Sequence, residues 1–390
     1  MGRQPHSVLR PADTHRRDTR VRIAHVLTYA SADGAFGGPT RVALAQAKAL
    51  AGLGHDVTVF AGAPADEATD RVQDGYRLRT FPARRVLPFG GFATLWPRGL
   101  ARALKDQADQ IDVAHIHLAR DLSTLPAALT LAAHRVPYVV QAHGMVDTSQ
   151  RPLARILDIV ATKRVLRRAH SWLVLTDSEQ SEMMKLAPGG RVTRITNGVE
   201  IGDVPPLGGS RGDVLFLARL HERKRPVAFV EIAKALGADL PHATFTLIGP
   251  DEGEGEAVKQ AIAGSGMADR LRWLGPVPPS ATSAAFTAAR VYVLPAVNEV
   301  FPMSILESFA AGTPVVTTSS LGIAGDCRKY GAAVVTDGSV REMAQAVREV
   351  YVDDQLSESL RAGARTYLSE KLDVRSVANT LVGEYVEAQS

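Results

Sequence analysis

Two glutamates lie on either side of an expected helix start in the phrase NEVFPMSILESFAAGTPVV, residues 298–316. A helix is expected at 303–311, between a proline that suits a helix start and a glycine that suits a helix end. Glu299 precedes this helix and Glu307 lies on its second turn. Carboxylates accept hydrogen bonds from hydroxyl groups, and the free N–H groups of a helix start attract phosphate. The pair fits a ligand with hydroxyls at one end, phosphates in the middle and a ribose at the other. Either glutamate alone is equally typical of an ordinary surface helix.

A basic pair occurs earlier, in the phrase FLARLHERKRP at residues 216–226. We place Arg219 at the carboxyl end of a strand and Lys224 in the loop that follows it. A guanidinium and an ammonium held together neutralise a diphosphate, the role that a divalent metal plays elsewhere. The alternative is a solvated basic loop that also includes Arg223 and Arg225.

A glycine pair near the N-terminus offers a third candidate contact. Gly37 and Gly38 precede Pro39, which suits the first turn of a helix. A helix start behind two glycines is an anion site, although a plain tight turn has the same sequence. The phrase lacks the G-x-G-x-x-G dinucleotide fingerprint, which argues against a dehydrogenase.

These residues need a scaffold, and the chain alternates short apolar runs with helical stretches. Runs such as VRIAHVL, HDVTVFAG and DVAHIH precede residue 200, and DVLFLARL, TFTLIGP and VYVLPA follow it. Continuous apolar runs are typical of parallel strands buried on both faces. The sequence therefore predicts the α/β class, with two Rossmann-like, doubly wound parallel-sheet domains facing each other across a cleft.

The expected boundaries follow from local composition. The cluster DVPPLGGS, Asp203–Ser210, cannot continue a helix or a central strand, so the domains are expected to meet there. We predict a disordered leader at 1–20, an N-terminal domain at 21–204, a C-terminal domain at 205–374 and a closing helix at 375–390. The closing helix is expected to cross back to the N-terminal domain.

Composition excludes several classes of protein. The chain has 390 residues, of which 45% are hydrophobic and 22% charged, as in ordinary globular proteins. No run approaches the roughly 18 apolar residues of a membrane span, and the leader lacks the apolar segment of a secretory signal. Cys327 is the only cysteine, which excludes an internal disulfide and a thiolate metal cluster. We expect a cytoplasmic protein.

The net charge of +4 hides an asymmetry, because the excess of Lys and Arg lies in residues 1–200. A basic N-terminal domain could approach an anionic acceptor or the inner face of a membrane. The stretch Phe81–Leu104 mixes aromatic and basic residues and is a candidate for lipid contact, or else a packed loop and helix. No nucleic-acid motif is present, so we expect no nucleic-acid partner.

Together the motifs resemble the retaining glycosyltransferases of the GT-B fold, group 1, also called family 4. The resemblance runs from about residue 21 to the C-terminus. Its most specific element is the E-x7-E pattern, here EVFPMSILE, supported by RLHERK, GGPTR, QAHG and NGV in the expected order. The resemblance implies transfer of a sugar from a nucleotide diphosphate sugar, UDP favoured over GDP, to a sugar, lipid-linked or small-molecule hydroxyl acceptor. Such an enzyme serves polysaccharide or glycoconjugate biosynthesis without a metal or another cofactor.

The resemblance also implies roles for individual residues. The residues expected to act in catalysis are His143 near the anomeric centre, Arg219 and Lys224 at the diphosphate, and Glu299 at the donor-sugar hydroxyls. Further donor contacts are expected from Glu307 at the ribose, from Gly37, Gly38 and Asn197, and from the amides of Phe301, Met303 and Ser304. The leaving phosphate is expected to take the acceptor's proton, with retention at the anomeric carbon.

Three positions depart from the family pattern. Ala218 and Arg225 stand where glycine is usual, and Pro302 replaces a glycine and removes one N–H. Two other functions stay open, a GT-B nucleotide-sugar epimerase and a non-catalytic GT-B subunit. A zinc site made by His115, His117 and His143 is not expected, because zinc requires further ligands in fixed geometry. His117 is expected to make a polar contact and His115 to pack in the core.

Overall fold

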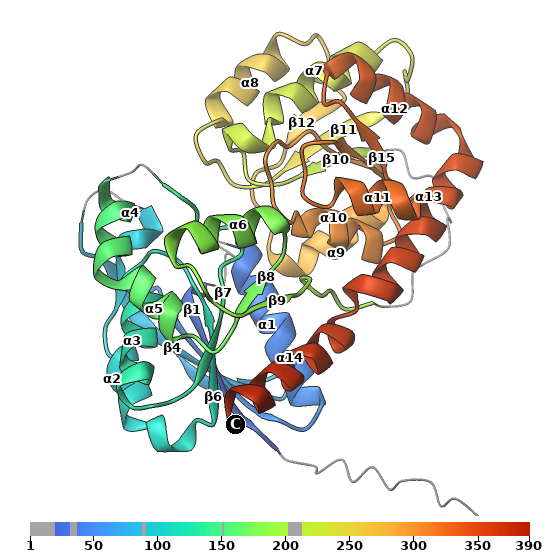
Figure 1. The fold of residues 1–390 in the computed structure, drawn as a ribbon. Coiled ribbons are helices and arrows are strands. Elements are labelled where there is room, and N and C mark those ends of the chain that lie inside the picture. The colour runs from blue at the N-terminus through green and yellow to red at the C-terminus, as the bar shows by residue number, and fades with distance from the viewer. Residues whose placement is uncertain (1–19, 32–36, 88–90, 150–151, 202–212) are drawn as a thin grey trace, which may run out of the picture.

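The computed structural model describes residues 20–31, 37–87, 91–149, 152–201 and 213–390, which form two α/β units, each built on a mainly parallel sheet (Figure 1). The predicted boundary at Asp203–Ser210 and the predicted leader, apart from Arg20, lie outside the described residues. The structure confirms the α/β class and the doubly wound arrangement.

The first sheet has the strand order β3-β4-β2-β1-β6-β7-β8-β9, with β5 paired to β4. Its strands are β1 (Arg22–Tyr29), β2 (Asp56–Ala63), β3 (Asp70–Gln73), β4 (Tyr76–Arg85), β5 (Leu95–Pro97), β6 (Val113–His117), β7 (Tyr138–Gln141), β8 (Trp172–Val174) and β9 (Val192–Arg194). The helices of this unit are α1 (Gly37–Gly52), α2 (Leu100–Asp106), α3 (Thr124–Ala133), α4 (Pro152–Leu157), α5 (Lys163–Arg168) and α6 (Asp177–Leu186). A π-helical turn, Asp158–Thr162, joins α4 to α5.

The first sheet has an antiparallel edge beside its otherwise parallel strands. Strands β3 and β5 both pair antiparallel with β4. Each has only three or four residues, and β3 is largely exposed, so neither carries the continuous apolar run that marks a buried strand.

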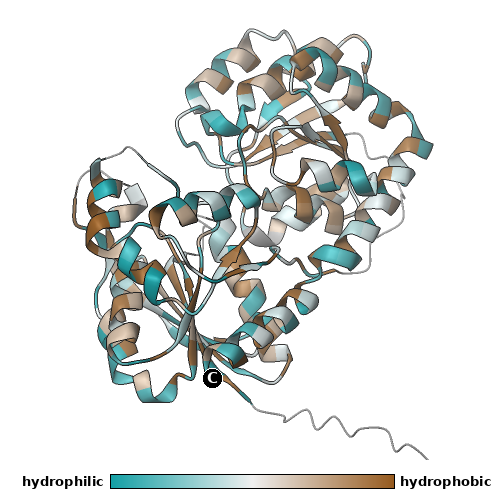
Figure 2. Cartoon of the chain, in the orientation of Figure 1, coloured by the Kyte–Doolittle hydropathy of each residue, from teal (hydrophilic) through white to brown (hydrophobic). Residues whose placement is uncertain are grey.

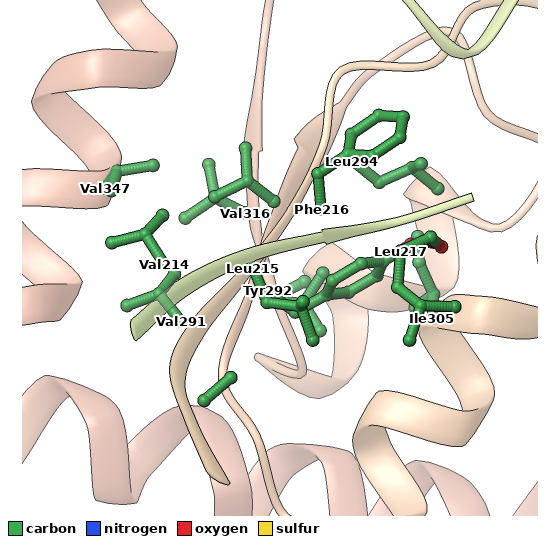
Figure 3. Packing of buried hydrophobic residues seen from close by; sticks show 14 of the residues in the cluster. Val214, Leu215, Phe216, Leu217, Val291, Tyr292, Leu294, Ile305, Val316 and Val347 are labelled. Atoms are coloured by element: carbon green, nitrogen blue, oxygen red, sulfur yellow. Dashed lines mark hydrogen bonds between the residues drawn. The ribbon is translucent and has the colours of Figure 1, made fainter. Parts of the chain in front are cut away.

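The second sheet has the order β12-β11-β10-β13-β14-β15, and all its strand pairs are parallel. Its strands are β10 (Asp213–Leu217), β11 (Thr244–Ile248), β12 (Leu271–Trp273), β13 (Ala289–Leu294), β14 (Val315–Thr318) and β15 (Val334–Thr336). Its helices are α7 (Pro226–Leu236), α8 (Gly255–Ala263), α9 (Pro279–Ala288), α10 (Met303–Ala310), α11 (Ala324–Tyr330), α12 (Val340–Val352) and α13 (Asp354–Tyr367). Side chains of β10 and β13 interdigitate with Ile305 and Val347 from the covering helices (Figure 3).

Each sheet reverses its strand order beside a central strand. In the first sheet β1 lies between β2 and β6, and in the second β10 lies between β11 and β13. Ligands of open α/β sheets bind at the carboxyl ends of the strands at such switch points. A ligand is therefore expected at the loops that follow β1, β6, β10 and β13.

The last helix, α14 (Val374–Ala388), leaves the second unit and packs on the first, alongside α1 (Figure 1). Its buried residues Val377, Ala378, Leu381 and Tyr385 join the apolar cluster beneath α1. The predicted closing helix, 375–390, corresponds to α14. No helix within the described parts of the chain is both long enough and apolar enough to span a membrane.

Candidate functional site

The loop after β10 carries Arg219 and Lys224 at the switch point of the second sheet. A short 3-10 helix, Glu222–Lys224, ends at Arg225, whose φ of 53° lies in the left-handed region that favours glycine. The Arg225 guanidinium donates a 2.9 Å hydrogen bond to the Gly338 carbonyl. This anchor offers a physical reason why arginine is accepted where the family usually has glycine.

Lys224 and Glu299 form an ion pair at the base of this loop. The side chains are 11% and 19% exposed, so both charges are largely removed from water. Burial lowers the pKa of Lys224, and the carboxylate of Glu299 opposes that shift. A backbone hydrogen bond from Val297 to the carbonyl of Arg223, 2.8 Å long, also ties the two loops together. The structure thus brings these two predicted site residues together.

Arg219 is engaged by an acidic residue that the sequence analysis did not identify. Its Nη1 donates to both carboxylate oxygens of Glu252 at 2.8 Å. Glu252 lies in the loop between β11 and α8, and nothing in its local sequence marked it. In the structure, therefore, both predicted diphosphate-binding cations hold a carboxylate.

The start of α10 follows Glu299 directly. Pro302 caps the helix with no side-chain hydrogen bond, and the helix begins at Met303 as predicted. The Ser304 Oγ lies 2.7 Å from the Tyr292 hydroxyl, which fixes that side chain toward β13. The first N–H groups of a helix have no intrahelical partner, so the amides of Met303 and Ser304 can still donate to a ligand.

Glu307 makes a contact between the two units. Arg41 of α1 donates to Glu307 Oε1 at 2.6 Å, whereas the buried Oε2 has no hydrogen bond from any described residue. Arg41 belongs to the phrase GGPTR, but its charge was not used in the sequence analysis. The carboxylate of Glu307, which is predicted to bind the ribose, therefore has one oxygen paired with Arg41 and one oxygen without a hydrogen bond from a described residue.

The first unit contributes a strained turn after β7. His143 has φ 52° and Gly144 has φ 74°. A Cβ at Gly144 would lie 2.8 Å from Cγ2 of Val300 in the second unit, so the two units touch here. The buried Glu179 carboxylate accepts hydrogen bonds from the amides of Gly144 (2.7 Å) and Leu175 (2.6 Å) and holds the turn. Burial raises the pKa of Glu179.

His143 is half-buried, and its Nε2 lies 2.8 Å from Nδ1 of His117. Burial lowers the pKa of His143 to about 3, so its ring is neutral near pH 7. His117 makes the polar contact that the sequence predicted. His115 does more than pack in the core, because its Nδ1 lies 2.8 Å from the Tyr385 hydroxyl of α14.

The remaining predicted positions have different surroundings. Asn197 is buried, and its Oδ1 accepts a 3.2 Å hydrogen bond from Gln141 Nε2, which turns its side chain into the first unit. Helix α1 begins at Gly37, two residues before the expected start at Pro39. A Cβ at Gly38 would meet no described atom within 4 Å. The expected contacts of Gly37, Gly38 and Asn197 with the donor remain predictions.

The stretch Phe81–Leu104, a candidate for lipid contact, is partly buried and partly exposed. Its residues form parts of β4, β5 and α2, in which Leu95, Leu100 and Leu104 are buried. Trp96 is exposed, but it lies in the antiparallel pair of β5 with β4. Residues 88–90 lie outside the described residues, and lipid contact by this stretch remains a prediction.

Comparison with known proteins gives consistent matches along the chain. The profile for the glycosyl transferase 4-like domain matches residues 37–198, and that for glycosyl transferases group 1 matches residues 203–367. The chain is 29% identical over 323 residues to a D-inositol 3-phosphate glycosyltransferase of Geodermatophilus obscurus, covering 74% of this chain and 70% of the relative. It is 27% identical over 377 residues to a glycogen synthase of Mycobacterium tuberculosis, covering 87% and 89%.

Solved structures share the fold at lower identity. HepE of Anabaena in complex with UDP has a TM-score of 0.72 at 18% identity, covering 95% of this chain and all of the other. WaaG, a glycosyltransferase involved in lipopolysaccharide biosynthesis, has a TM-score of 0.66 at 17% identity, covering 92% and 98%. These similarities identify the fold as GT-B. Because the two matched profiles together span most of both units, the chain belongs to the group 1 glycosyltransferases.

Proposed function

We propose that this enzyme transfers a sugar from a UDP-sugar to a hydroxyl acceptor, without a metal and with retention at the anomeric carbon. The observation that carries the proposal is the buried pair of Lys224 and Glu299, set between Arg219 and the open start of α10. Cations and free amides there suit a diphosphate, and the carboxylate suits sugar hydroxyls. The solved complexes of HepE with UDP and with UDP-glucose support uracil as the base.

The reaction separates charge in a predictable way. The bond between the anomeric carbon and the diphosphate oxygen breaks, leaving an oxocarbenium-like sugar and a negative leaving group. Arg219, Lys224 and the amides of α10 stabilise that negative charge, usually the largest contribution in such sites. The leaving phosphate oxygen then takes the acceptor hydroxyl's proton while the acceptor oxygen bonds to the same face of the sugar.

Two side chains occupy positions that groups of the bound donor would take. The carboxylate of Glu252 occupies the Arg219 guanidinium where a phosphate would bind, and Arg41 occupies one oxygen of Glu307 where ribose hydroxyls would bind. In each exchange the group in the site gains a hydrogen-bonding partner from the donor. The displaced Glu252 and Arg41 are 32% and 38% exposed, so water can solvate the charges that lose their partners. A nucleotide-sugar epimerase and a non-catalytic subunit are the alternatives.

Calorimetry with UDP, GDP, ADP and NAD in EDTA tests the donor site. We expect UDP to bind without metal and the Lys224→Ala variant to bind it at least tenfold more weakly. Lys234→Ala, an exposed lysine on α7, is the matched control. Binding of NAD alone, or equal UDP affinity in both variants, would exclude the proposed donor site. Release of UDP only with an added acceptor separates a transferase from an epimerase.

We also propose that the acceptor side approaches an anionic membrane at the inner face, through α4, the π-turn and α5. This stretch exposes Ile156 (58%), Ile159 (74%) and Val160 (67%). Figure 2 shows hydrophobic colour on this outer helix. Its single acidic residue, Asp158, faces inward and pairs with Arg120 at 2.7 Å.

Basic residues continue the same outer surface toward α5. Those exposed are Arg155, Arg164, Arg167 and Arg168. An apolar face bordered by cations and free of acids is typical of a helix that lies in the interface of an anionic bilayer. We expect co-sedimentation with phosphatidylglycerol vesicles but not with phosphatidylcholine vesicles. Ile159→Asp should reduce it several-fold, whereas Val72→Asp, at an equally exposed site on β3, should not. Equal loss in both variants would contradict the assignment.

A further inference from the structure

Four histidines and one tyrosine form a continuous chain of polar contacts through the first unit. His143 Nε2 lies 2.8 Å from His117 Nδ1, and His117 Nε2 lies 3.0 Å from His25 Nδ1. His25 Nε2 lies 3.4 Å from the Tyr385 hydroxyl, which lies 2.8 Å from His115 Nδ1. The chain leads from the turn after β7 to the last helix, α14.

The sheet explains why these rings meet. His25 of β1 is directly opposite His115 of β6, and His117 lies two residues further along the same strand. Alternate residues of a strand share a face, so the three imidazoles line the face that α1 and α14 cover. Tyr385 reaches that face from α14, and His143 follows the neighbouring strand β7.

A metal ion does not explain the cluster. Three of the imidazoles have nitrogen atoms within 4.8 Å of one another. However, the rings of His115 and His117 are stacked, 4.3 Å apart at an interplanar angle of 14°. A ring nitrogen coordinates in the plane of its ring, so parallel stacked rings do not direct lone pairs at one ion. The 3.0 Å contact of His25 with His117 suits an N–H···N hydrogen bond instead.

All four imidazole rings are neutral near pH 7, and the chain of polar contacts requires neutral rings. Burial lowers the pKa of His25 and of His143 to about 3 and lowers the pKa values of His115 and His117 well below the ordinary range. A neutral imidazole has one N–H donor and one acceptor nitrogen. Each ring can therefore donate in only one direction along the chain.

Only two arrangements of protons satisfy every link and also let the buried Tyr385 hydroxyl donate its proton. In the first, all four histidines carry the proton on Nε2, and the Tyr385 hydroxyl donates to His115. In the second, all four carry it on Nδ1, and Tyr385 donates to His25. His143 Nδ1 is buried without a hydrogen bond from a described residue. That atom is an acceptor in the first arrangement and a donor in the second.

We propose that Tyr385 is a positioning residue that couples the proton arrangement of all four histidines and so fixes which hydrogen bond His143 offers. The coupling rests on this geometry alone. Its effect on sugar transfer rests on the proposed function, in which His143 contacts the donor sugar. A helix at the end of the chain thereby sets the hydrogen-bonding character of a residue at the boundary between the two units.

Nitrogen-15 NMR of labelled histidine tests the coupling without substrate, because the two ring nitrogens report the tautomer directly. The chain has 11 histidines, and single His→Gln variants assign the four signals. In the wild type we expect the same tautomer in all four. In Tyr385→Phe, the shortened chain of contacts must leave one N–H without a partner, either on His25 Nε2 or on His143 Nδ1. His25 is fully buried and His143 only half-buried, so the unpartnered N–H should lie on His143 Nδ1. His25, His117 and His143 should then carry Nδ1–H, while the released His115 takes the intrinsically favoured Nε2–H form.

The variant spectrum must therefore differ from wild type whichever arrangement the wild type adopts. Mixed tautomers in the folded wild type, or an unchanged spectrum in Tyr385→Phe, would overturn the proposal. Thr193→Val is the control, since it removes a 2.8 Å hydrogen bond to Glu384, the neighbour of Tyr385, and leaves the chain intact. It should keep the shared tautomer. His25→Leu provides a second break if Tyr385→Phe does not fold.

Kinetics separate this inference from the proposed function. If His143 contacts the donor sugar, Tyr385→Phe should lower kcat several-fold with little change in KM, whereas Thr193→Val should not. A tautomer change with unchanged transfer would uphold the coupling and refute the role of His143 in transfer. An unchanged tautomer with reduced transfer would refute the coupling.

Discussion

Replacing Glu299 by glutamine tests whether the buried pair with Lys224 holds the donor site together. The change keeps the side-chain size and removes only the charge. Lys224 then remains 11% exposed and loses the carboxylate that opposes its desolvation. The pKa of Lys224 should fall further below its ordinary value, because the remaining influences on it, burial and the neighbouring Arg219 and Arg223, all lower it.

The size of the effect follows from burial. Removing one partner of a fully buried ion pair costs about 3–5 kcal/mol, because the other charge is left uncompensated. Both groups here keep some exposure to water, so we expect about 2–3 kcal/mol less stability at neutral pH. That loss should be measurable as a lower urea midpoint with an unchanged slope.

The pH dependence gives the sharper assay. Lys224 has a lowered pKa in the folded state, so its protonated form favours unfolding. The penalty is full below the folded pKa and disappears as pH rises to the unfolded value, roughly 10.4. The difference in stability between Glu299→Gln and wild type should therefore shrink from about pH 7 to about pH 10. Measuring it as a difference cancels the other titrating groups.

A double-mutant cycle supplies the control. Lys224→Met combined with Glu299→Gln leaves no buried charge, so the double variant should recover most of the stability lost by Glu299→Gln alone. A loss that is the same at both pH values, or a double variant that is no more stable, would refute the argument from desolvation.

Three further outcomes are expected. Arg41→Ala frees Glu307 for ribose hydroxyls. Because the two side chains are 38% and 22% exposed, the gain in UDP-binding free energy is at most about 1 kcal/mol, or about fivefold tighter UDP binding by calorimetry. Weaker binding would contradict competition between Arg41 and the ribose for Glu307. Gly144→Ala places a Cβ 2.8 Å from Val300 at a position with positive φ, so it should lower Tm and the rate of sugar transfer. Gly54→Ala is also at positive φ but has open space around the new Cβ, so it should lower Tm less. Equal losses of Tm in the two variants would assign the effect to φ alone. The free energy of unfolding should fall as pH drops from about 6.5 toward 3, by up to about 1.4 kcal/mol per pH unit for each buried histidine. The reason is that the lowered pKa values of the folded state make the unfolded chain bind protons first. Denaturation curves that coincide at about pH 7 and pH 5 would contradict this.

The strands of the central sheets were predictable because each is a continuous apolar run. Burial on both faces requires such runs, and β10 and β13 illustrate it with one partly exposed residue each. Strand β3, with the sequence DRVQ, is held by its pairing with β4 and is largely exposed. No sequence period marks a short edge strand whose stability comes from its neighbour.

The donor side of the site was predictable for a similar local reason. The carboxylates of Glu299 and Glu307 and the start of α10 lie within one short phrase, so their relation depends only on helix geometry. Their partners are far away in sequence. Arg41 reaches Glu307 only because α1 of the first unit faces α10 of the second, which composition and spacing do not determine.

The acceptor side shows where reasoning from sequence must fail. The sequence placed His115 and His117 on one face of a strand, but their role depends on His25 from β1 and Tyr385 from α14. Strand order decides the first neighbour and the path of the last helix decides the second. A buried neutral imidazole has one donor and one acceptor nitrogen, so one fixed contact constrains the next. The position of the proton on one ring therefore decides its position on the next ring. The hydrogen bond that a single histidine can offer thus depends on the whole chain of contacts.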